Sequence, residues 1–466
     1  MEKRMLICAP VTSRSGYGDH ARDLVRAFFK HNKYKISILD VPWGDCPRNA
    51  LDSNDKRDVE ILNAILDPNA VLKHQPDVYV DIRIPNEFQT VGKFNIGITA
   101  GIETTAVSQA WLDGCNKMDL VIVPSEHAKI GFAQSAYEKV QQAPDGTQHK
   151  VGELKLEKPI EVLFEGADED IYKPLTKDEI DSDFFDMLNE KVPEKFAFLF
   201  VGMWGKGGYG EDRKDIGRML KVFYESFANK KKQPALILKT SGASFSVMDK
   251  EDCLTKIRQV KSRFPDDWKL PNVYLLHGEL SDNEMNYLYN HPKVKCMVSF
   301  THGEGFGRPL LEATMTGLPV IASGWSGQID FLNDEYTILL PGTLGKVPKS
   351  ARWKDIIIKE SEWFTIDENE AYKVLNHAYT NSFDIKANAK KQMSENIEKF
   401  DTILESYLSS APTQVSLNLP KLKKVEDKSE KIEKVALPKL KKVNKSEKSE
   451  IELPKLKKTT SEGASV

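Results

Sequence analysis

Two glutamates eight residues apart are the residues of this sequence best suited to chemistry: Glu304 within a glycine-rich loop and Glu312 in the first turns of the helix expected after it. The loop, Gly303 to Gly307, contains three glycines, and Pro309 follows at a position typical of a first helical turn. Free backbone N–H groups and the positive end of a helix would together bind an anion such as phosphate. A carboxylate repels a phosphate unless the ligand also carries hydroxyl groups that donate hydrogen bonds to the carboxylate. These residues therefore predict a nucleotide sugar as ligand.

The spacing of the two glutamates leaves a plainer alternative open. In that alternative Glu304 only caps the helix and Glu312 is a solvated helical residue. An exposed loop carboxylate at position 304 would contribute little to stability.

Regular elements are expected on both sides of the loop. The apolar run 296–300 is too short for a helix and predicts a buried strand. A helix should start near Pro309 and stop at Gly317, because glycine favours the left-handed conformation after a helix end. Residues 319–323 predict the next parallel strand. The segment is therefore a strand, loop, helix and strand unit.

This segment resembles a known family. The string EGFGRPLLEA, followed by TGLPVIAS, is similar to the paired-glutamate signature of the retaining family 4 glycosyltransferases, of the group 1 glycosyl transferase type. The resemblance covers about residues 4–410 and is strongest over 196–332. It implies the GT-B architecture, in which two Rossmann-like domains face each other across a cleft, and transfer of a sugar from a nucleotide-diphosphate sugar with retention of configuration.

The same resemblance assigns expected contacts to the donor. It implies that Glu304 meets the hydroxyls of the donor sugar and that Glu312 meets its ribose. The backbone amides of Gly305, Phe306 and Gly307 are expected to bind the phosphates.

Two adjacent cations, Arg213 and Lys214, are the expected charges for the diphosphate leaving group. They resemble the family's donor diphosphate site, although Met203 stands where many members carry arginine and the loop 204–212 is long. Arg213 is therefore expected to supply the missing charge. No aspartate-rich metal motif is visible, so we expect a metal-independent enzyme without a cofactor. The alternative is that both cations begin a solvated helix.

The first half of the chain supplies three further candidates. Glu103 follows the strand expected at 93–99, and ligands bind at such carboxyl ends, so we expect it on the acceptor side. A carboxylate at a helix N-terminus is the alternative for this residue. The resemblance implies that Gly16 and Gly18 approach the donor phosphate from the opposite domain.

A dinucleotide fingerprint competes with this interpretation. Gly16, Gly18 and Ala21 match G-x-G-x-x-A, and Asp40 follows at the expected distance. The match suggests an NAD-dependent Rossmann oxidoreductase. Against it, residues 10–15 form a longer loop than the tight turn of that fingerprint allows.

Strands alternate with helices through most of the chain, and this predicts an α/β protein with parallel sheets. The expected organisation is an N-terminal Rossmann-like acceptor domain at 1–170, a connection at 171–192, a C-terminal Rossmann-like donor domain at 193–383, a helical segment at 384–410 and a disordered tail at 411–466.

Composition narrows the class of protein. The 466 residues are 40% hydrophobic and 29% charged, with a formal net charge of -3 that gives no general attraction to nucleic acid. Five scattered cysteines suggest neither a disulfide framework nor a zinc site. Because no apolar run approaches the roughly 18 residues of a membrane span, we expect a cytoplasmic protein.

The tail differs from the rest. LPKLKK occurs three times, at Leu419, Leu437 and Leu453, and residues 411–466 hold 14 lysines against 8 acidic residues. Such a segment cannot bury a core, so we expect it to be disordered. It is either a solvated tail or a multivalent motif for an acidic partner or an anionic surface.

The sequence therefore predicts a retaining glycosyltransferase of the hexosyltransferase type. It does not identify the sugar, the base, the oligomeric state, or whether the acceptor is a glycan, lipid or protein. A GT-B nucleotide-sugar epimerase and a non-catalytic nucleotide-sugar-binding scaffold remain alternatives.

Overall fold

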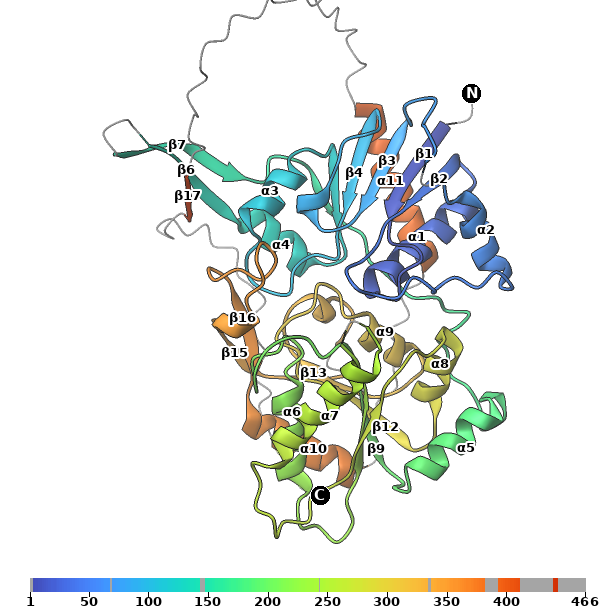
Figure 1. Ribbon diagram of the computed structural model, residues 1–466, viewed down its shortest axis with the longest axis vertical. Coiled ribbons are helices and arrows are strands. Elements are labelled where there is room, and N and C mark those ends of the chain that lie inside the picture. Colours follow the sequence, from blue (N-terminus) through green and yellow to red (C-terminus); the bar gives the residue numbers. More distant parts are fainter. Residues whose placement is uncertain are drawn as a thin grey trace, which may run out of the picture.

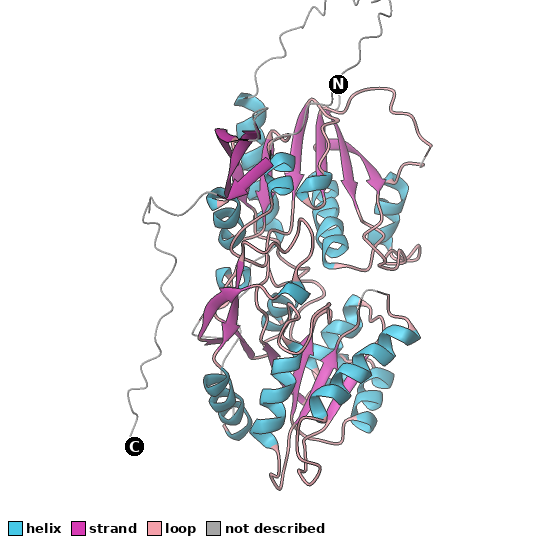
Figure 2. Cartoon of the chain, turned by 60° about the vertical axis from the view of Figure 1, so that its left-hand side comes forward, coloured by secondary structure: helices cyan, strands magenta, loops and turns pink. Residues whose placement is uncertain are grey.

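Two α/β domains lie one above the other along the long axis of the molecule (Figure 1). This computed structural model describes residues 3–67, 69–142, 147–242, 244–333, 337–381, 393–410 and 439–442. Each domain contains a six-stranded parallel sheet with helices packed against it (Figure 2). The predicted fold class is confirmed.

The first sheet has the strand order β2-β1-β3-β4-β5-β8. Its strands are β1 (Lys3–Ala9), β2 (Tyr34–Asp40), β3 (Val78–Ile82), β4 (Phe94–Ile98), β5 (Leu120–Val123) and β8 (Ile160–Val162), and its helices are α1 (Gly16–His31), α2 (Lys56–Ala64), α3 (Gln109–Cys115) and α4 (Glu126–Gln134). Strands β3, β4 and β5 are buried throughout, as expected for a parallel sheet covered on both faces.

The second sheet has the order β11-β10-β9-β12-β13-β14. The strands of this domain are β9 (Ala197–Val201), β10 (Ala235–Lys239), β11 (Val273–Leu276), β12 (Val294–Ser299), β13 (Val320–Ser323), β14 (Thr337–Leu340) and the antiparallel pair β15 (Gly342–Lys346) and β16 (Glu362–Ile366); its helices are α5 (Ser182–Lys191), α6 (Ile216–Phe227), α7 (Val247–Lys261), α8 (Asp282–Asn290), α9 (Arg308–Met315) and α10 (Glu368–Thr380). The strand order reverses between β9 and β12. Open α/β sheets bind ligands at such a point.

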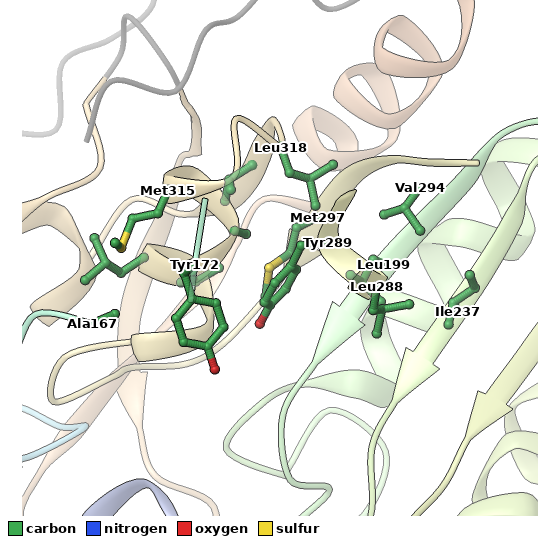
Figure 3. Packing of buried hydrophobic residues seen from close by; sticks show 14 of the residues in the cluster. Ala167, Tyr172, Leu199, Ile237, Leu288, Tyr289, Val294, Met297, Met315 and Leu318 are labelled. Atoms are coloured by element: carbon green, nitrogen blue, oxygen red, sulfur yellow. The ribbon is translucent and has the colours of Figure 1, made fainter. Parts of the chain in front are cut away.

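Helix α9 begins where the sequence predicted. Gly307 precedes it with φ +98°, which glycine adopts readily, and Gly317 follows it with φ +82°. Figure 3 shows Ala167 and Tyr172 of the interdomain segment beside Met315 of this helix. The apolar core of the second domain therefore fixes the position of α9.

A small antiparallel sheet projects from the first domain (Figure 1). It consists of β6 (Ala136–Gln142), β7 (Gln148–Lys155) and β17 (Lys439–Lys442), with β6 in the middle. The sequence did not predict β17, which comes from the second LPKLKK repeat. The other tail residues lie outside the described part of the chain.

Helix α11 (Met393–Ser410) follows the second domain in sequence but packs on α1 of the first, where Leu404 is buried. Residues 384–392 of the expected helical segment lie outside the described residues. None of the helices described here combines the length and apolar character needed to cross a membrane.

Candidate functional site

Four residues predicted as catalytic lie together where the two domains meet. The loops after β9 and β12 leave the second sheet at the reversal of strand order and bring Arg213 and Lys214 to Glu304. Arg213 Nη1 lies 3.1 Å from Glu304 Oε2, and Lys214 Nζ donates to Glu304 Oε1. From the first domain, Glu103 Oε1 lies 3.6 Å from Arg213 Nε. We name Glu103, Arg213, Lys214 and Glu304 the Glu304 cluster.

Burial excludes the solvated alternatives for this cluster. Only 7% of Glu304 and 9% of Lys214 are exposed, so neither is a free surface residue. The expectation that Glu304 is an exposed loop carboxylate is wrong, because its loop is covered by the first domain. Glu103 is not a helix N-terminal residue either, since α3 begins only at Gln109.

The charge of Glu304 follows from its two cations. Burial raises the pKa of this carboxyl, but Lys214 and Arg213 outweigh burial and lower the pKa to about 2. Burial lowers the pKa of Lys214, although Glu304 opposes that effect. At neutral pH Glu304 is therefore ionised, and it can accept hydrogen bonds but cannot donate a proton.

The glycines of the loop permit close contact between the domains. A Cβ at Gly303 would lie 2.0 Å from the carbonyl oxygen of Glu103, and one at Gly305 would lie 1.8 Å from that of Ala100. Ser125 Oγ also donates to the carbonyl oxygen of Gly305, at 2.6 Å. Packing against the first domain thus requires glycine at positions 303 and 305, whether or not a ligand is present.

The backbone of this loop nevertheless offers donors for an anion. Within the described residues, the N–H groups of Gly305, Phe306 and Gly307 have no hydrogen-bond partner. They lie at the N-terminal end of α9, where the helix dipole favours negative charge. The side chain of Phe306 is buried against Phe164 and Phe331, so only its backbone amide can contact a ligand.

The second glutamate, Glu312, has a different environment one helical turn into α9. Its carboxylate accepts from Arg308 Nε and from the Tyr289 hydroxyl, both at 2.9 Å. Arg308 also reaches the first domain, where Nη1 lies 2.5 Å from Asp23 Oδ2 and 3.9 Å from Glu165 Oε1. We name these five residues the Arg308 cluster; it joins the domains through one shared cation.

Burial determines protonation in the Arg308 cluster. It raises the pKa of Glu312 to about 7 and that of Glu165 to about 8, and the attraction of Arg308 offsets only part of this effect. Only 6% of Glu312 is exposed, so its interpretation as a solvated helical residue is wrong.

Sequence reasoning missed Arg308, Asp23 and Glu165 as site residues. Arg308 stands inside the signature string, and its spacing of four residues from Glu312 on a predicted helix was an available signal. Asp23 and Glu165 lie in distant segments, and no spacing indicates that they meet Arg308.

The two glycines of the first domain that are predicted to approach the donor phosphate, Gly16 and Gly18, have different surroundings in the structure. A Cβ at Gly18 would lie 2.1 Å from the carbonyl oxygen of Ser13, so its own loop requires this glycine. Apart from its chain neighbours and its own helix, no atom of the described residues lies within 4 Å of a Cβ built at Gly16, which leaves room beside that residue. Asp40 accepts from the Thr12 hydroxyl at 2.7 Å. In this structure Asp40 therefore supports the loop between β1 and α1.

Comparisons with known proteins agree with this architecture. The family described as "Glycosyl transferases group 1" matches residues 220–362, which include both signature glutamates. Sucrose-phosphate synthase from Thermosynechococcus elongatus is similar in structure, with a TM-score of 0.53 at 12% identity over 88% of this chain and 100% of that chain. The trehalose-6-phosphate phosphatase N-terminal domain from Candida albicans gives 0.52 at 11% identity over 88% and 97%.

No curated protein matches the sequence. At these identities the structural likeness shows the fold alone. Together with the family match, it confirms the resemblance to group 1 glycosyltransferases of GT-B fold; retention of configuration is not tested by it.

Proposed function

We propose that this chain of the group 1 glycosyltransferase type transfers a hexose from a nucleotide-diphosphate sugar to an acceptor hydroxyl, with retention of configuration. The observation that carries the proposal is the meeting of Arg213, Lys214 and the unpaired amides of residues 305–307 around Glu304. Two cations and a helix N-terminus match a diphosphate, and one ionised carboxylate matches sugar hydroxyls.

The reaction breaks the bond between the sugar C1 and the diphosphate oxygen, and the electron pair leaves with the diphosphate. The acceptor oxygen forms a new bond to C1, and its proton passes to the departing diphosphate oxygen, which carries the electron pair of the broken bond. Arg213, Lys214 and the amides would stabilise the negative charge that grows on the leaving group. Because the cations already neutralise charge, we propose that turnover needs no metal ion.

Ionised Glu304 would accept hydrogen bonds from the donor sugar, and Glu312 would accept one from the ribose. Glu312 already has Arg308 and Tyr289 as donors, so a ribose hydroxyl would be a third. We place the acceptor on the first domain, beside Glu103. We also propose that Gly16, which has room beside it, lets the backbone of the first domain approach the donor phosphate.

A two-stage experiment tests the proposal. Nucleotide sugars with different bases are first screened by thermal shift with the full chain, and candidate acceptors are then added with the best donor. We expect free nucleoside diphosphate to appear only with acceptor, and Glu304→Gln to abolish its release. Glu370→Gln, at a partly exposed position of α10 that belongs to neither cluster, serves as the control.

Other outcomes would contradict the proposal. Isomerised donor without any acceptor would indicate an epimerase. Binding of the donor with no turnover on any acceptor, equal in wild type and Glu304→Gln, would indicate a scaffold.

A further inference from the structure

The edge of β6 that faces away from β7 is occupied by a segment of the C-terminal tail. Strand β17 pairs with it in antiparallel register, Lys439 opposite Val140 and Lys442 opposite Tyr137 (Figure 1). These four residues are the KLKK of the second LPKLKK repeat. Backbone pairing with a strand edge is a general way to bind an extended peptide.

Strand β6 is held firmly by the first domain. The Tyr137 hydroxyl donates to the carbonyl oxygen of Val107 at 2.5 Å, and Tyr137 is buried in one cluster with Trp111 and Leu154. The strand pairs with β7 along its whole length. Without β17 the opposite edge would present unpaired N–H and C=O groups, so β6 is a preformed template for one more strand.

The tail carries three copies of the segment that pairs. Residues 421–424 and 455–458 repeat the KLKK of 439–442, and Leu-Pro precedes it in each copy. Proline has no N–H, and its position before the first paired residue leaves the ladder intact. Every copy therefore presents the same backbone donors and acceptors, in the same order, to β6.

Charge also favours this register. Glu138 lies opposite Glu153 of β7 on one side and opposite position 441, a lysine, on the other. Lys150 of β7 already donates to Glu138 at 3.2 Å, and a further lysine at the opposite register position would add to the balance of charge against the two carboxylates. Each of the three repeats brings a lysine to the position opposite Glu138.

We propose that the β6 edge is a strand-accepting site for the LPKLKK repeats, and that any of the three repeats of the same chain occupies it. A single four-residue strand binds weakly. Because the repeats belong to the same chain as β6, we expect their effective concentration at the edge to be about millimolar, the order typical of intramolecular binding. The occupant is thus the chain's own tail, and two repeats remain unpaired at any moment.

Full-length variants that stop strand pairing in one repeat at a time test the proposal. Each variant carries two neighbouring prolines inside one KLKK: L422P/K423P, L440P/K441P or L456P/K457P. Neighbouring N–H groups of a strand point to opposite sides, so one of the two prolines removes a donor to β6. The measurement is hydrogen exchange of those backbone amides of residues 137–140 that point away from β7, since the amides bonded to β7 stay protected in every variant. L417P/N418P, in the tail but outside the repeats, is the matched control.

With one repeat substituted, protection should fall by about a third of its wild-type value, and with two repeats substituted by another third. The reason is that three equivalent ligands become two and then one. Protection should vanish in the triple variant and return when the peptide LPKLKKV is added. A scrambled peptide of the same composition should not restore it.

Three results would overturn the proposal. Protection that survives in the triple variant would show that no repeat occupies the edge. Complete loss of protection when only the second repeat carries the prolines would show that the repeats are not equivalent. Protection of the wild type that rises with protein concentration would identify a second copy of the chain as the occupant.

Discussion

Glu304 and Glu312 are almost equally buried, with 7% and 6% of each residue exposed. At neutral pH, however, Glu304 is ionised, whereas Glu312 is protonated in about half of the molecules. The pKa of Glu304 is lowered to about 2, whereas that of Glu312 is raised to about 7. The difference lies in the supply of cations. Glu304 has Lys214 and Arg213 within bonding distance, while Glu312 shares Arg308 with two carboxylates of the first domain.

The comparison shows that the spacing of two glutamates in the sequence does not determine whether their carboxyl groups are ionised. In the Glu304 cluster, two cations face two carboxylates. In the Arg308 cluster, one cation faces Asp23, Glu165 and Glu312, so desolvation prevails for the two glutamates. The first arrangement suits a charged ligand that can displace one member, and the second suits a fixed junction between domains.

The largest effect should follow from removing the charge of Glu304. Glu304→Gln should lower kcat by about 100-fold or more, as losing a group that contacts the transition state does. It should also lower the free energy of unfolding by about 3 kcal/mol, because Lys214 and Arg213 stay buried without their partner. Steady-state kinetics and urea unfolding measure the two effects. A variant as active as wild type would remove Glu304 from the site.

The pH dependence of stability should have opposite signs at the two glutamates. Glu304, with its lowered pKa, contributes stability above about pH 4.5 that is lost as the pH falls toward 2. Glu312, with its raised pKa, costs stability as the pH rises from about 4.5 through 7. Each effect is on the order of 3 kcal/mol. Urea unfolding of Glu304→Gln, Glu312→Gln and wild type across this range checks the signs; equal slopes would contradict the comparison.

Removing the shared cation should have a smaller effect. Arg308→Met should destabilise the chain by about 2 kcal/mol, since Asp23 and Glu312 lose a donor but the glutamates can keep their protons. The loss should grow as the pH rises above 7. Arg258→Met, at an exposed arginine of α7, is the control in the same unfolding assay. If both variants unfold alike, Arg308 does not hold the junction.

The smallest effect should come from a chelator. Because Arg213, Lys214 and the α9 N-terminus take the place of a cation at the diphosphate, excess EDTA should change turnover by less than about twofold. Release of nucleoside diphosphate, with and without the chelator, is the measurement. Turnover abolished by EDTA and restored by manganese would contradict the proposed role of the two cations.

Much of the fold could be predicted because each element carries its own periodicity. The apolar pattern predicts a strand at 273–276 and a helix at 216–227, and β11 and α6 have these bounds. The pattern also predicts a helix over 126–137, but α4 ends at Gln134, because Tyr137 packs in a buried cluster of the first domain and the chain continues as β6. That change depends on tertiary packing, which local pattern does not record.

The site was predicted unevenly for a similar reason. Glu304, Arg213 and Lys214 follow strands that are neighbours at the reversal of strand order, so topology brings together what the motifs suggested. Two partners of Arg308, Asp23 and Glu165, come from the other domain, and Asp23 is 285 residues away in the sequence. The sequence likewise does not show which neighbour requires a glycine. At position 305 it is the carbonyl oxygen of Ala100, which lies too close for any Cβ.

The return of α11 to the first domain has a mechanical consequence. The chain leaves the first domain before α5 and must come back after α10, so two separate connections join the domains. The domains are therefore joined at two places in the sequence, and we expect their relative motion to be more restricted than with a single connection. Any opening for substrates would also have to break the ion pairs that cross between the domains, Glu103 with Arg213 and Asp23 with Arg308.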